Sequence, residues 1–387
     1  MLWLDKWQPK KLGKMDYHDS LSERMSAMAG SVDVPHLMVY GPPGAGKKTR
    51  VMAFLREVFG PGASKLRLEH ASFKTPSGKS IDVTTIASNF HVEINAGDCG
   101  IYDRIVVQEV IKSVAMFRPL NMGGTIATAS ETAAAAAAAA AAGPASAAST
   151  PSAKGFKMLV LTEVDRLTHA AQHALRRTME KYSQTCRVIL ICNAASSVIE
   201  PIRSRCLGIR VAAPTHEEVC TVLTKTCKKE GLTLPPDLAM RISRQTKRNL
   251  RAALLLLEST KVQSYPFRGD QRLRLPDWRE FVSCIANDIV KKQSPQQLLA
   301  IRKKFYQLLV NCIPADVVLR TLASELAPKV DEDLRHEIMH WSAFYEHRLT
   351  QGRKDIVHLE AFVAKFMSIY KATMLRFAAD MGDFDDY

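Results

Sequence analysis

The sequence lacks the marks of several protein classes. No apolar run approaches the roughly 20 residues that a helix needs to cross a membrane, so we expect no membrane span. The apolar start, Met1–Leu4, is too short for a secretory signal and is followed at once by charged residues. No two cysteines have the C-x-x-C spacing of zinc and redox sites, and several of the eight lie in apolar runs. This usage favours reduced cysteines in an intracellular protein.

The charge of the chain is unbalanced. Its 387 residues carry a formal net charge of +14, and this length allows two or three domains with buried cores. A basic excess points to a polyanionic partner, of which nucleic acid is the usual one. Because no block of five or six like charges occurs, we expect the positive charge on folded surface and not in a tail. Charge alone does not separate a nucleic-acid-binding protein from a merely basic one.

A glycine-rich segment between a predicted strand and a predicted helix carries most of the functional signal. His36–Tyr40 is a short apolar run, and apolar residues recur at helical spacing from Val51 to Val58. The segment between them matches the phosphate-binding pattern G-x-x-x-x-G-K-[ST] except at its last position. In such loops backbone N–H groups and a helix N-terminus cradle the phosphates, and the lysine reaches their outer oxygens. We therefore predict that a nucleotide is bound by Gly41, Pro42, Pro43, Gly44, Ala45, Gly46, Lys47, Lys48 and Thr49.

The departure from the pattern lies at Lys48, where a hydroxyl that binds Mg²⁺ is expected. An ammonium group cannot ligate a cation. Thr49 follows one residue later on the helix and is turned by about 100°, so it cannot simply take over the role. The loop thus predicts a site that holds a nucleotide but hydrolyses it poorly.

A second departure follows the apolar run Met158–Leu161. In P-loop ATPases this strand ends in Asp-Glu, of which the aspartate supports Mg²⁺ and the glutamate orients and deprotonates the attacking water. Here Thr162 stands at the position of the aspartate, and Glu163 keeps the position of the glutamate. Both groups expected to hold the metal are therefore missing, which predicts weak or absent Mg²⁺ binding. An alternative, compatible with the first, is that Thr162-Glu163 caps the next helix.

Alternating strand and helix patterns predict the fold of the first part of the chain. Further apolar runs at 66–68, 92–94, 188–192 and 207–211 are separated by helical patterns such as 103–117. This alternation is typical of a mostly parallel sheet with helices on both faces. After Pro214 helical patterns dominate to the end of the chain.

The patterns divide the chain into three predicted domains. We place a nucleotide-binding domain at 1–213, a small helical lid at 214–265 and a second helical domain at 266–387. The first contains a low-complexity Ala-rich insert at about 121–154. Alanine favours helix, but the insert has no large apolar face to anchor one, so we favour a disordered surface segment.

Three motifs resemble those of a known family. The opening Trp3–Pro9 is similar to a W-x-x-K-[YW]-R-P opening, with Gln8 in place of the usual arginine. Ala171–Tyr182 resembles a central helix, and Ser204-Arg205-Cys206 matches an S-R-C box. These motifs are those of the small subunits of replication factor C, the eukaryotic loader of sliding DNA clamps, which belongs to the AAA+ ATPases. The resemblance covers nearly the whole chain except the Ala-rich insert.

Other residues narrow the resemblance to one branch of these small subunits. They are Lys48 together with Thr162, and Tyr345–Arg348 in the C-terminal helices. The resemblance implies an AAA+ domain with a parallel five-stranded sheet and helices on both faces. A helical lid and an all-α collar domain, which closes the ring of subunits, would follow.

The resemblance also implies roles for single residues. Arg205 corresponds to the arginine finger, which acts on a nucleotide bound by the neighbouring subunit. Asn193, after the run 188–192, corresponds to the first sensor, which can bond the γ-phosphate or water. Arg251 corresponds to the second sensor on the lid, and Glu163 to what remains of the acidic motif. Without the loop and the S-R-C box, a turn-capping asparagine and solvated arginines would be the simpler interpretations.

The implied partners are other replication factor C subunits in a hetero-pentamer, the PCNA clamp and primer–template DNA. The implied cofactor is ATP or ADP, and the implied location is the nucleus. Members of the family track the phosphate backbone of the duplex, a contact that reads no bases. Candidates for this contact are Arg176, Arg177, Lys79 and Arg104, although solubility is the simpler role for any one of them. Six aromatic residues fit the collar or, more simply, the chain's own core: Trp341, Phe344, Tyr345, Phe362, Phe366 and Tyr370.

Three functions are consistent with these patterns. We favour a clamp-loader subunit, active in DNA replication and repair, that binds nucleotide with little or no hydrolysis and serves its neighbour through Arg205. A self-sufficient AAA+ motor or helicase is the alternative, and Lys48 and Thr162 speak against it. A scaffold that no longer binds nucleotide is the third, and the glycines with Lys47 speak against that.

Overall fold

The computed structural model describes residues 1–31, 33–74, 80–95, 97, 100, 102–116 and 156–382. The Ala-rich insert at about 121–154 and the DNA candidate Lys79 lie outside these residues. The chain forms two compact units, Met1–Leu273 and Arg274–Tyr387. The finer division at residues 213 and 265 stays a prediction.

Within the described residues, the first unit is built on a seven-stranded sheet in the order β2-β3-β4-β5-β6-β1-β7. The strands are β1 Leu37–Tyr40, β2 Arg67–Lys74, β3 Ser80–Ala87, β4 His91–Asn95, β5 Lys157–Thr162, β6 Cys186–Cys192 and β7 Leu207–Arg210. Five neighbouring strands of this order, β4, β5, β6, β1 and β7, pair in parallel, which confirms the predicted five-stranded core.

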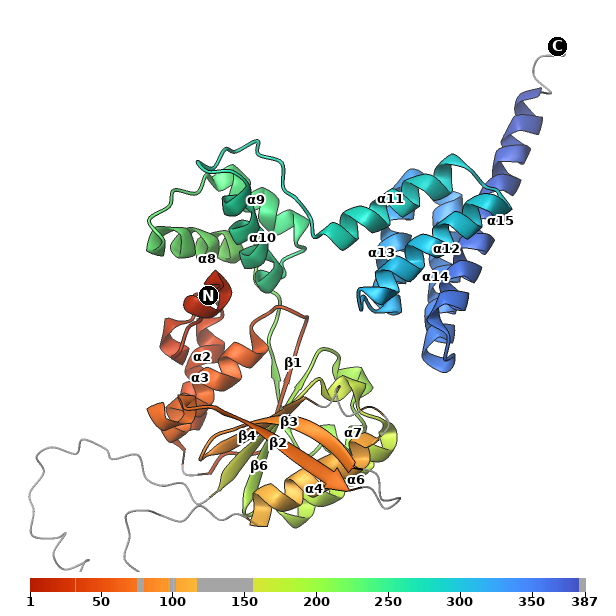
Figure 1. The fold of residues 1–387 in the computed structure, drawn as a ribbon. Helices are drawn as coiled ribbons and strands as arrows, with labels where there is room; N and C mark the ends of the chain where they lie inside the picture. Colours follow the sequence, from red (N-terminus) through yellow and green to blue (C-terminus); the bar gives the residue numbers. More distant parts are fainter. Residues whose placement is uncertain are drawn as a thin grey trace, which may run out of the picture. The chain divides into compact units, whose positions relative to one another are not determined.

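The remaining two strands add an antiparallel hairpin at one edge of this core. β2 pairs with β3 along its whole length, and β3 pairs with β4. The apolar run 66–68 leads into β2, but Leu68 is 65% exposed, so it does not belong to a buried strand. The hairpin makes the sheet mixed at this edge (Figure 1).

Alternate residues of the central strands pack into two separate cores, one on each face of the sheet. Val160 of β5 packs with Phe54 of α3 (Lys47–Phe59), on the face that α2 (Asp19–Gly30) also covers. Leu161 packs on the opposite face with Val110 of α4 (Asp103–Met116) and Leu175 of α6 (His169–Lys181). This two-sided burial explains why these strands read as continuous apolar runs.

Three helices follow the sheet: α8 (His216–Lys229), α9 (Pro236–Gln245) and α10 (Leu250–Gln263). The N-cap Thr215 and Glu218 form a capping box that starts α8. Leu223, Ile242 and Leu257 meet in one core, and Trp3 of the short helix α1 (Trp3–Lys6) joins them. The predicted helical segment therefore includes the N-terminal motif in its core.

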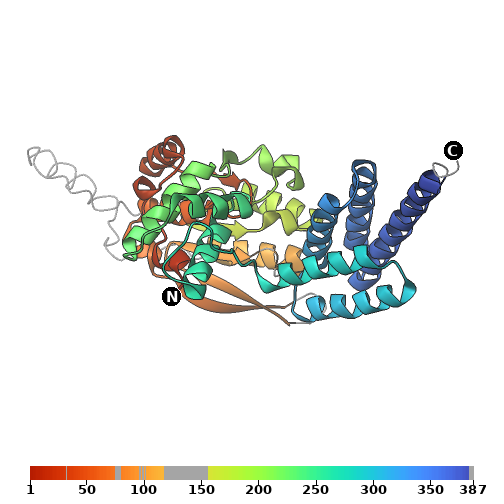
Figure 2. The same ribbon diagram turned by 90° about the horizontal axis from the view of Figure 1, so that it is seen from above.

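The second unit is helical throughout its described elements (Figure 2). They are α11 (Asp277–Lys291), α12 (Pro295–Val310), α13 (Ala315–Leu326), α14 (Glu332–Gln351) and α15 (Asp355–Gly382). Phe362 and Phe366 are buried in the core of this unit, and Trp341, Tyr345 and Tyr370 pack against it. The simpler interpretation of these aromatics, a core within the chain, is therefore correct, although Phe344 remains exposed.

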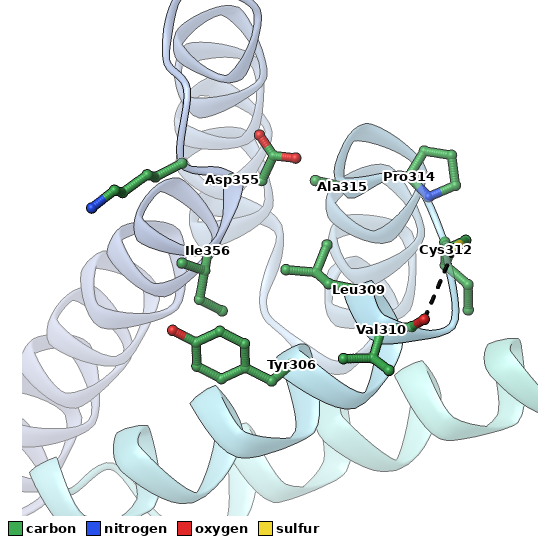
Figure 3. A pocket seen from close by; sticks show the side chains of 10 residues that line it. Tyr306, Leu309, Val310, Cys312, Pro314, Ala315, Asp355 and Ile356 are labelled. Atoms are coloured by element: carbon green, nitrogen blue, oxygen red, sulfur yellow. Dashed lines mark hydrogen bonds between the residues drawn. The ribbon is translucent and has the colours of Figure 1, made fainter.

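A shallow apolar hollow of about 550 Å³ lies in the second unit, between the end of α12 and the starts of α13 and α15 (Figure 3). Tyr306, Leu309 and Ile356 line it, and Lys354 and Asp355 are its charged members. The glycine-rich loop belongs to the other unit, so the hollow is not part of the predicted nucleotide site. No helix among the described residues is both long and apolar enough to span a bilayer.

Candidate functional site

The glycine-rich loop joins β1 to α3 and is shaped by close neighbours. Gly44 and Gly46 have φ angles of 74° and 80°, a region that residues with a Cβ atom rarely adopt. A Cβ atom at Gly44 would lie 1.8 Å from Oδ1 of Asn249, and one at Gly46 would lie 2.2 Å from Oη of Tyr17. The loop therefore needs glycine at both positions. It presents the N-terminus of α3, whose first N–H groups have no partner within the helix, so its shape fits a phosphate group.

Lys47 is folded into the loop and is only 7% exposed. Its Nζ donates hydrogen bonds to the carbonyl oxygens of Gly41 (2.7 Å) and Pro42 (2.9 Å) and to Oδ1 of Asn193 (2.9 Å). Burial lowers the pKa of Lys47, because the charged form loses hydration. An anion bound in the loop would give this ammonium a charged acceptor in place of neutral ones.

Asn193 lies just beyond β6, as predicted, and the structure brings it to the loop lysine. Its backbone N and its Nδ2 each lie 3.4 Å from a carboxylate oxygen of Asp165, to which they donate. Asp165 thus orients the asparagine whose Oδ1 accepts from Lys47. The arrangement can transmit a change at the phosphate position to the segment after β5.

The two positions where a metal ligand is expected hold other interactions. Lys48 is ion-paired with Glu93 of β4, and the Glu93 side chain is only 6% exposed. The Thr162 hydroxyl donates to the carbonyl of Ile94 (3.3 Å) and to Oδ1 of Asn95 (3.4 Å), within the sheet. The Thr49 hydroxyl accepts from Nε2 of Gln8 at 3.1 Å. Over the described ranges, no group of three or more His, Cys, Asp and Glu side chains could hold a metal ion.

Glu163 follows β5 with a φ angle of 55°. Its Oε2 lies 3.3 Å from Nη1 of Arg166, and both side chains are well exposed. The sequence alternative that Thr162-Glu163 caps the next helix holds for position only. Glu163 is the N-cap residue of the short 3₁₀-helix Val164–Arg166, but its side chain makes no capping hydrogen bond. The next α-helix, α6, is capped by Thr168, which accepts from Ala171 N.

Arg251 is exposed in the first turn of α10, next to the loop. The N-cap of this helix is Asn249, whose Oδ1 accepts from Ala252 N at 3.1 Å and also packs against Gly44. Burial is the main cause of the lowered pKa of Lys47, and the positive charge of Arg251 lowers it further by a smaller amount. The start of α10 therefore borders the predicted phosphate position, as a sensor on a lid requires.

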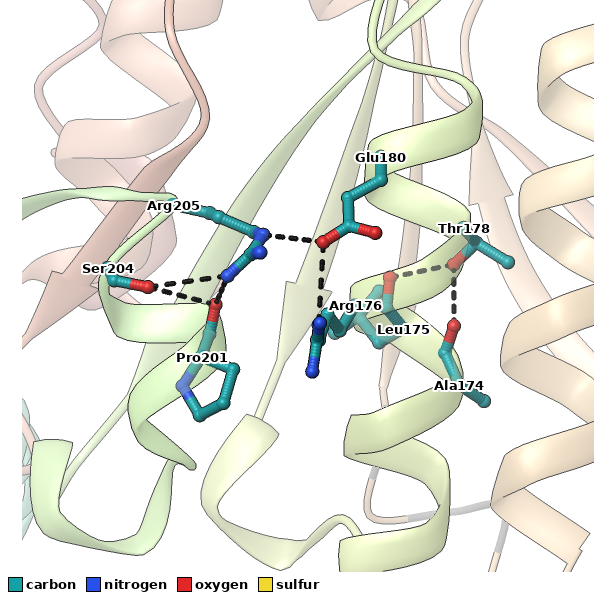
Figure 4. Close-up of polar contacts among 8 residues, drawn as sticks. All are labelled: Ala174, Leu175, Arg176, Thr178, Glu180, Pro201, Ser204 and Arg205. Atoms are coloured by element: carbon teal, nitrogen blue, oxygen red, sulfur yellow. Dashed lines mark hydrogen bonds and ion pairs between the residues drawn. The ribbon is translucent and has the colours of Figure 1, made fainter.

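Arg205 lies in the turn between the short helix α7 (Glu200–Arg203) and β7, where its side chain points toward Glu180 (Figure 4). Its Nε is 2.7 Å from Oε1 of Glu180, and its Nη1 donates to the carbonyl of Pro201 at 2.7 Å. Nε of Arg176 lies 3.4 Å from the same Glu180 oxygen. One carboxylate on α6 thus holds a predicted arginine finger and a predicted DNA contact.

The other DNA candidates within the described residues lie on two helices that pack side by side, α4 and α6 (Figure 1). Asp103, at the start of α4, accepts from the backbone N of Thr168 (2.7 Å) and from its hydroxyl (3.1 Å), which ties the two helix starts together. Arg104 and Arg177 are exposed on these helices, and Arg176 is half-buried.

Three residues of the site escaped the sequence analysis. Glu93 pairs with Lys48, Tyr17 donates to the carbonyl of Ala45 (3.0 Å), and Glu180 holds Arg205. Only Glu93 carried a signal, because a carboxylate in the middle of an apolar strand requires a partner. Tyr17 and Glu180 lie in unremarkable polar segments, and their roles depend on contacts distant in sequence.

Family models match three stretches of the chain. Residues 278–374 match the replication factor C subunit 3 C-terminal domain, and residues 221–262 match an RCF1/5-like AAA+ ATPase lid domain. Residues 142–215 match a model described as DNA polymerase III, delta subunit. The two helical matches fall in the helices after the sheet and in the second unit.

Curated relatives align over nearly the full length. The chain is 49% identical over 373 residues to "Replication factor C subunit 3" of Bos taurus, covering 96% of this chain and 97% of that protein. It is 48% identical to the protein of the same name from Homo sapiens, with the same coverage. It is also 48% identical to "Replication factor C subunit 5" of Oryza sativa subsp. japonica, covering 96% and 98%. The branch that Lys48 and Thr162 indicated is the one that carries these names.

Solved structures resemble the chain more distantly. The RuvB Holliday junction branch migration motor of Thermotoga maritima superimposes with a TM-score of 0.46 at 14% identity, over 77% of this chain and 85% of that chain. A variant of the same RuvB protein gives a TM-score of 0.47 at 14% identity, over 83% and 90%. A likeness this distant does not bear on activity.

Proposed function

This chain belongs to the replication factor C family, as a small subunit of a DNA clamp loader, and from that premise we propose that it helps to load the PCNA clamp onto primed DNA at the expense of ATP. Family membership implies the other replication factor C subunits as partners, and the AAA+ fold implies a bound nucleotide. PCNA, primer–template DNA, a nuclear location and a role in repair as well as replication belong to the proposal.

The subunit's own site holds ATP or ADP and hydrolyses it little or not at all. Two glycines with positive φ and the buried Lys47 support retention of the phosphates. The ion-paired Lys48 and the sheet-bonded Thr162 support the loss of hydrolysis, because they replace the hydroxyl and the carboxylate that place Mg²⁺. Phosphoryl transfer depends mainly on placement and charge, so this loss is severe. Mg²⁺ binding at this site is weak or absent.

The chain contributes to hydrolysis at the neighbouring subunit through Arg205. This guanidinium is partly exposed and is held by an exposed carboxylate, so it can be given to a phosphate of another subunit. Asn193 and Arg251 act as sensors of the chain's own nucleotide, and Glu163 is a remnant of the acidic motif. The positions of Asn193 and Arg251 near Lys47 support the two sensor roles.

DNA is held by charge and not by base reading. The net charge of +14 and the basic residues Arg104, Arg176 and Arg177 on two adjacent helices support this part of the proposal. The self-sufficient motor has no observation in its favour at the loop.

The observation that carries the proposal is a combination of two features. The phosphate-binding lysine, Lys47, is retained, whereas Lys48 and Thr162 replace the two residues that would place Mg²⁺. To test it, the loader is reconstituted from all its subunits with or without this chain, and PCNA left on primed circular DNA is counted. We expect loading with the chain and none without it. Undiminished loading by the four remaining subunits would contradict the proposal.

A further inference from the structure

A buried carboxylate next to the phosphate-binding loop has a cationic partner from that loop. Glu93 lies in the middle of β4, between the apolar Val92 and Ile94, and its side chain is 6% exposed. Lys48, in the first turn of α3, supplies the partner. A carboxylate in this setting is costly unless it is paired, so the two residues depend on one another.

The sheet register explains how the two side chains meet. Glu93 lies opposite Val160 of β5, and Asn95 lies opposite Thr162. Registered neighbours in parallel strands point to the same face of a sheet. Val160 packs in the core that α3 covers, so Glu93 and Thr162 both face the start of this helix. The Lys48–Glu93 pair therefore lies on the side of the loop where a metal ion would meet the acidic strand.

The Lys48 ammonium places one positive charge where a bound cation would lie, and Glu93 holds it there. In an intact site a hydroxyl and a carboxylate share a divalent ion. This chain instead has the ammonium of Lys48, which is covalently part of the chain, and the carboxylate of Glu93 on β4, which is separated from β6 by β5. The Lys48 side chain is 46% exposed, so the ammonium is not enclosed by its contact with Glu93. An attached ammonium cannot dissociate, and EDTA cannot remove it.

We propose that the Lys48–Glu93 pair takes the place of the divalent cation, so that the site binds the phosphates of a nucleoside di- or triphosphate without metal, with Glu93 as the positioning residue. The inference rests on the proposed nucleotide binding and adds to it the reason for metal independence. It assigns Glu93 a role that neither the loop pattern nor the acidic motif contains.

The test measures binding of fluorescent ADP to the full-length chain, in Mg²⁺ and in EDTA, for four proteins. They are the wild type, Lys48→Thr, the double variant Lys48→Thr/Glu93→Gln, and the control Lys112→Thr. The control removes an ammonium from an exposed pair with Glu109 on α4. The wild type and the control should bind equally well in both buffers.

Lys48→Thr restores the hydroxyl of the loop pattern and leaves Glu93 without its cation. A divalent ion should then enter, and binding should become roughly tenfold tighter in Mg²⁺ than in EDTA, a normal coupling between two ligands. The double variant removes the carboxylate as well, so this dependence should disappear. Loss of the dependence in the double variant identifies Glu93 as the group that holds the cation.

The outcomes separate the inference from the proposed function. A wild type that does not bind ADP, or that binds it only with Mg²⁺, would contradict the proposed function itself. A metal-independent wild type with an equally metal-independent Lys48→Thr would overturn the inference alone. So would a double variant that keeps the Mg²⁺ dependence.

A second variant keeps the inference testable if Lys48→Thr does not fold. Glu93→Gln leaves the half-exposed ammonium of Lys48 in place but removes the carboxylate that positions it beside the loop. We expect this variant to bind ADP more weakly than the wild type in EDTA, whereas Glu57→Gln, on the same helix as Lys48, should bind as the wild type does. Unchanged or tighter binding by Glu93→Gln would overturn the inference.

Discussion

Two ion pairs in the first unit differ in how far they are open to solvent. Lys48 and Glu93 meet beside the phosphate-binding loop, where the carboxylate is nearly buried. Arg205 and Glu180 meet on the surface, where the Glu180 side chain is 44% exposed. A buried carboxylate cannot exchange its partner without a large cost, whereas an exposed one can. The comparison suggests that the charges at the loop are fixed and that the arginine on the surface is available to another molecule.

Replacing the surface arginine should have the largest effect. In the assembled loader, Arg205→Ala should slow hydrolysis at the neighbouring subunit's site by about 10³- to 10⁵-fold, because the transferring phosphoryl group loses a cation. Single-turnover ATP hydrolysis by the reconstituted complex measures this. The matched control is Arg203→Ala, an exposed arginine two residues earlier on α7. Equal hydrolysis rates in Arg205→Ala and Arg203→Ala would contradict a role of Arg205 at the neighbouring subunit's site.

Replacing the loop lysine should affect binding and not a neighbour's rate. Lys47→Ala removes a buried ammonium with three acceptors, and nucleotide binding to the full chain should weaken by about 2–5 kcal/mol. Equilibrium titration with a fluorescent nucleotide measures the change. Lys112→Ala, on the exposed face of α4, serves as the control and should bind as the wild type does. Undiminished binding in Lys47→Ala would place the nucleotide elsewhere.

Acid should weaken the interior of the sheet through His91, on the same strand as Glu93. Burial lowers the pKa of His91 from its ordinary 6.5 to about 4, so the folded state favours the neutral ring. The stability it contributes is complete above the unfolded pKa and is lost as the pH falls from 6.5 toward 4. From pH 7 to pH 5 the free energy of unfolding should fall by about 2 kcal/mol more in the wild type than in His91→Gln.

Urea unfolding at the two pH values measures this difference. His169→Gln, at an exposed position on α6, should keep the full pH dependence of the wild type. If His91→Gln loses as much stability as the wild type between pH 7 and pH 5, the imidazole is not the group that titrates.

The smallest effect is expected at the exposed carboxylate. Glu180→Gln removes the charge that holds Arg205 and Arg176 but leaves both arginines in place. Because exposed pairs contribute little, the hydrolysis rate of the assembled loader should change by less than about fivefold. A loss as large as that of Arg205→Ala would show that the surface pair is as fixed as the buried one.

The sequence was sufficient for the parts of the fold with strong periodicity. The strands at 92–94, 158–161, 188–192 and 207–211 were predicted to within two residues at each end, because buried parallel strands are continuous apolar runs. The helix expected over 103–117 is found as Asp103–Met116. The loop, Lys47 and Asn193 were predicted from motifs, and the structure joins the last two by a hydrogen bond.

The sequence was insufficient where a feature depends on pairing between distant segments. Within the described residues, β2 is the edge strand of the sheet, and its Leu68 is 65% exposed, so this strand does not form a continuous apolar run. Glu93, the partner of Lys48, is 45 residues away in the sequence. It lies near the loop only because of the position that β4 takes in the sheet. The sharing of Glu180 by Arg176 and Arg205 depends on the packing of α6 beside the α7 turn. The position of Glu93 in an apolar strand signals that it needs a partner, but no local pattern identifies Lys48 as that partner or joins Arg205 to Glu180.

One measurement tests the central claim, that the site retains nucleotide without cleaving it. The purified full chain is mixed with γ-labelled ATP and Mg²⁺, and both bound nucleotide and released phosphate are followed over a single turnover. The account predicts bound nucleotide and no phosphate above the level seen with Lys47→Ala. Phosphate release by the wild type that Lys47→Ala abolishes would contradict it.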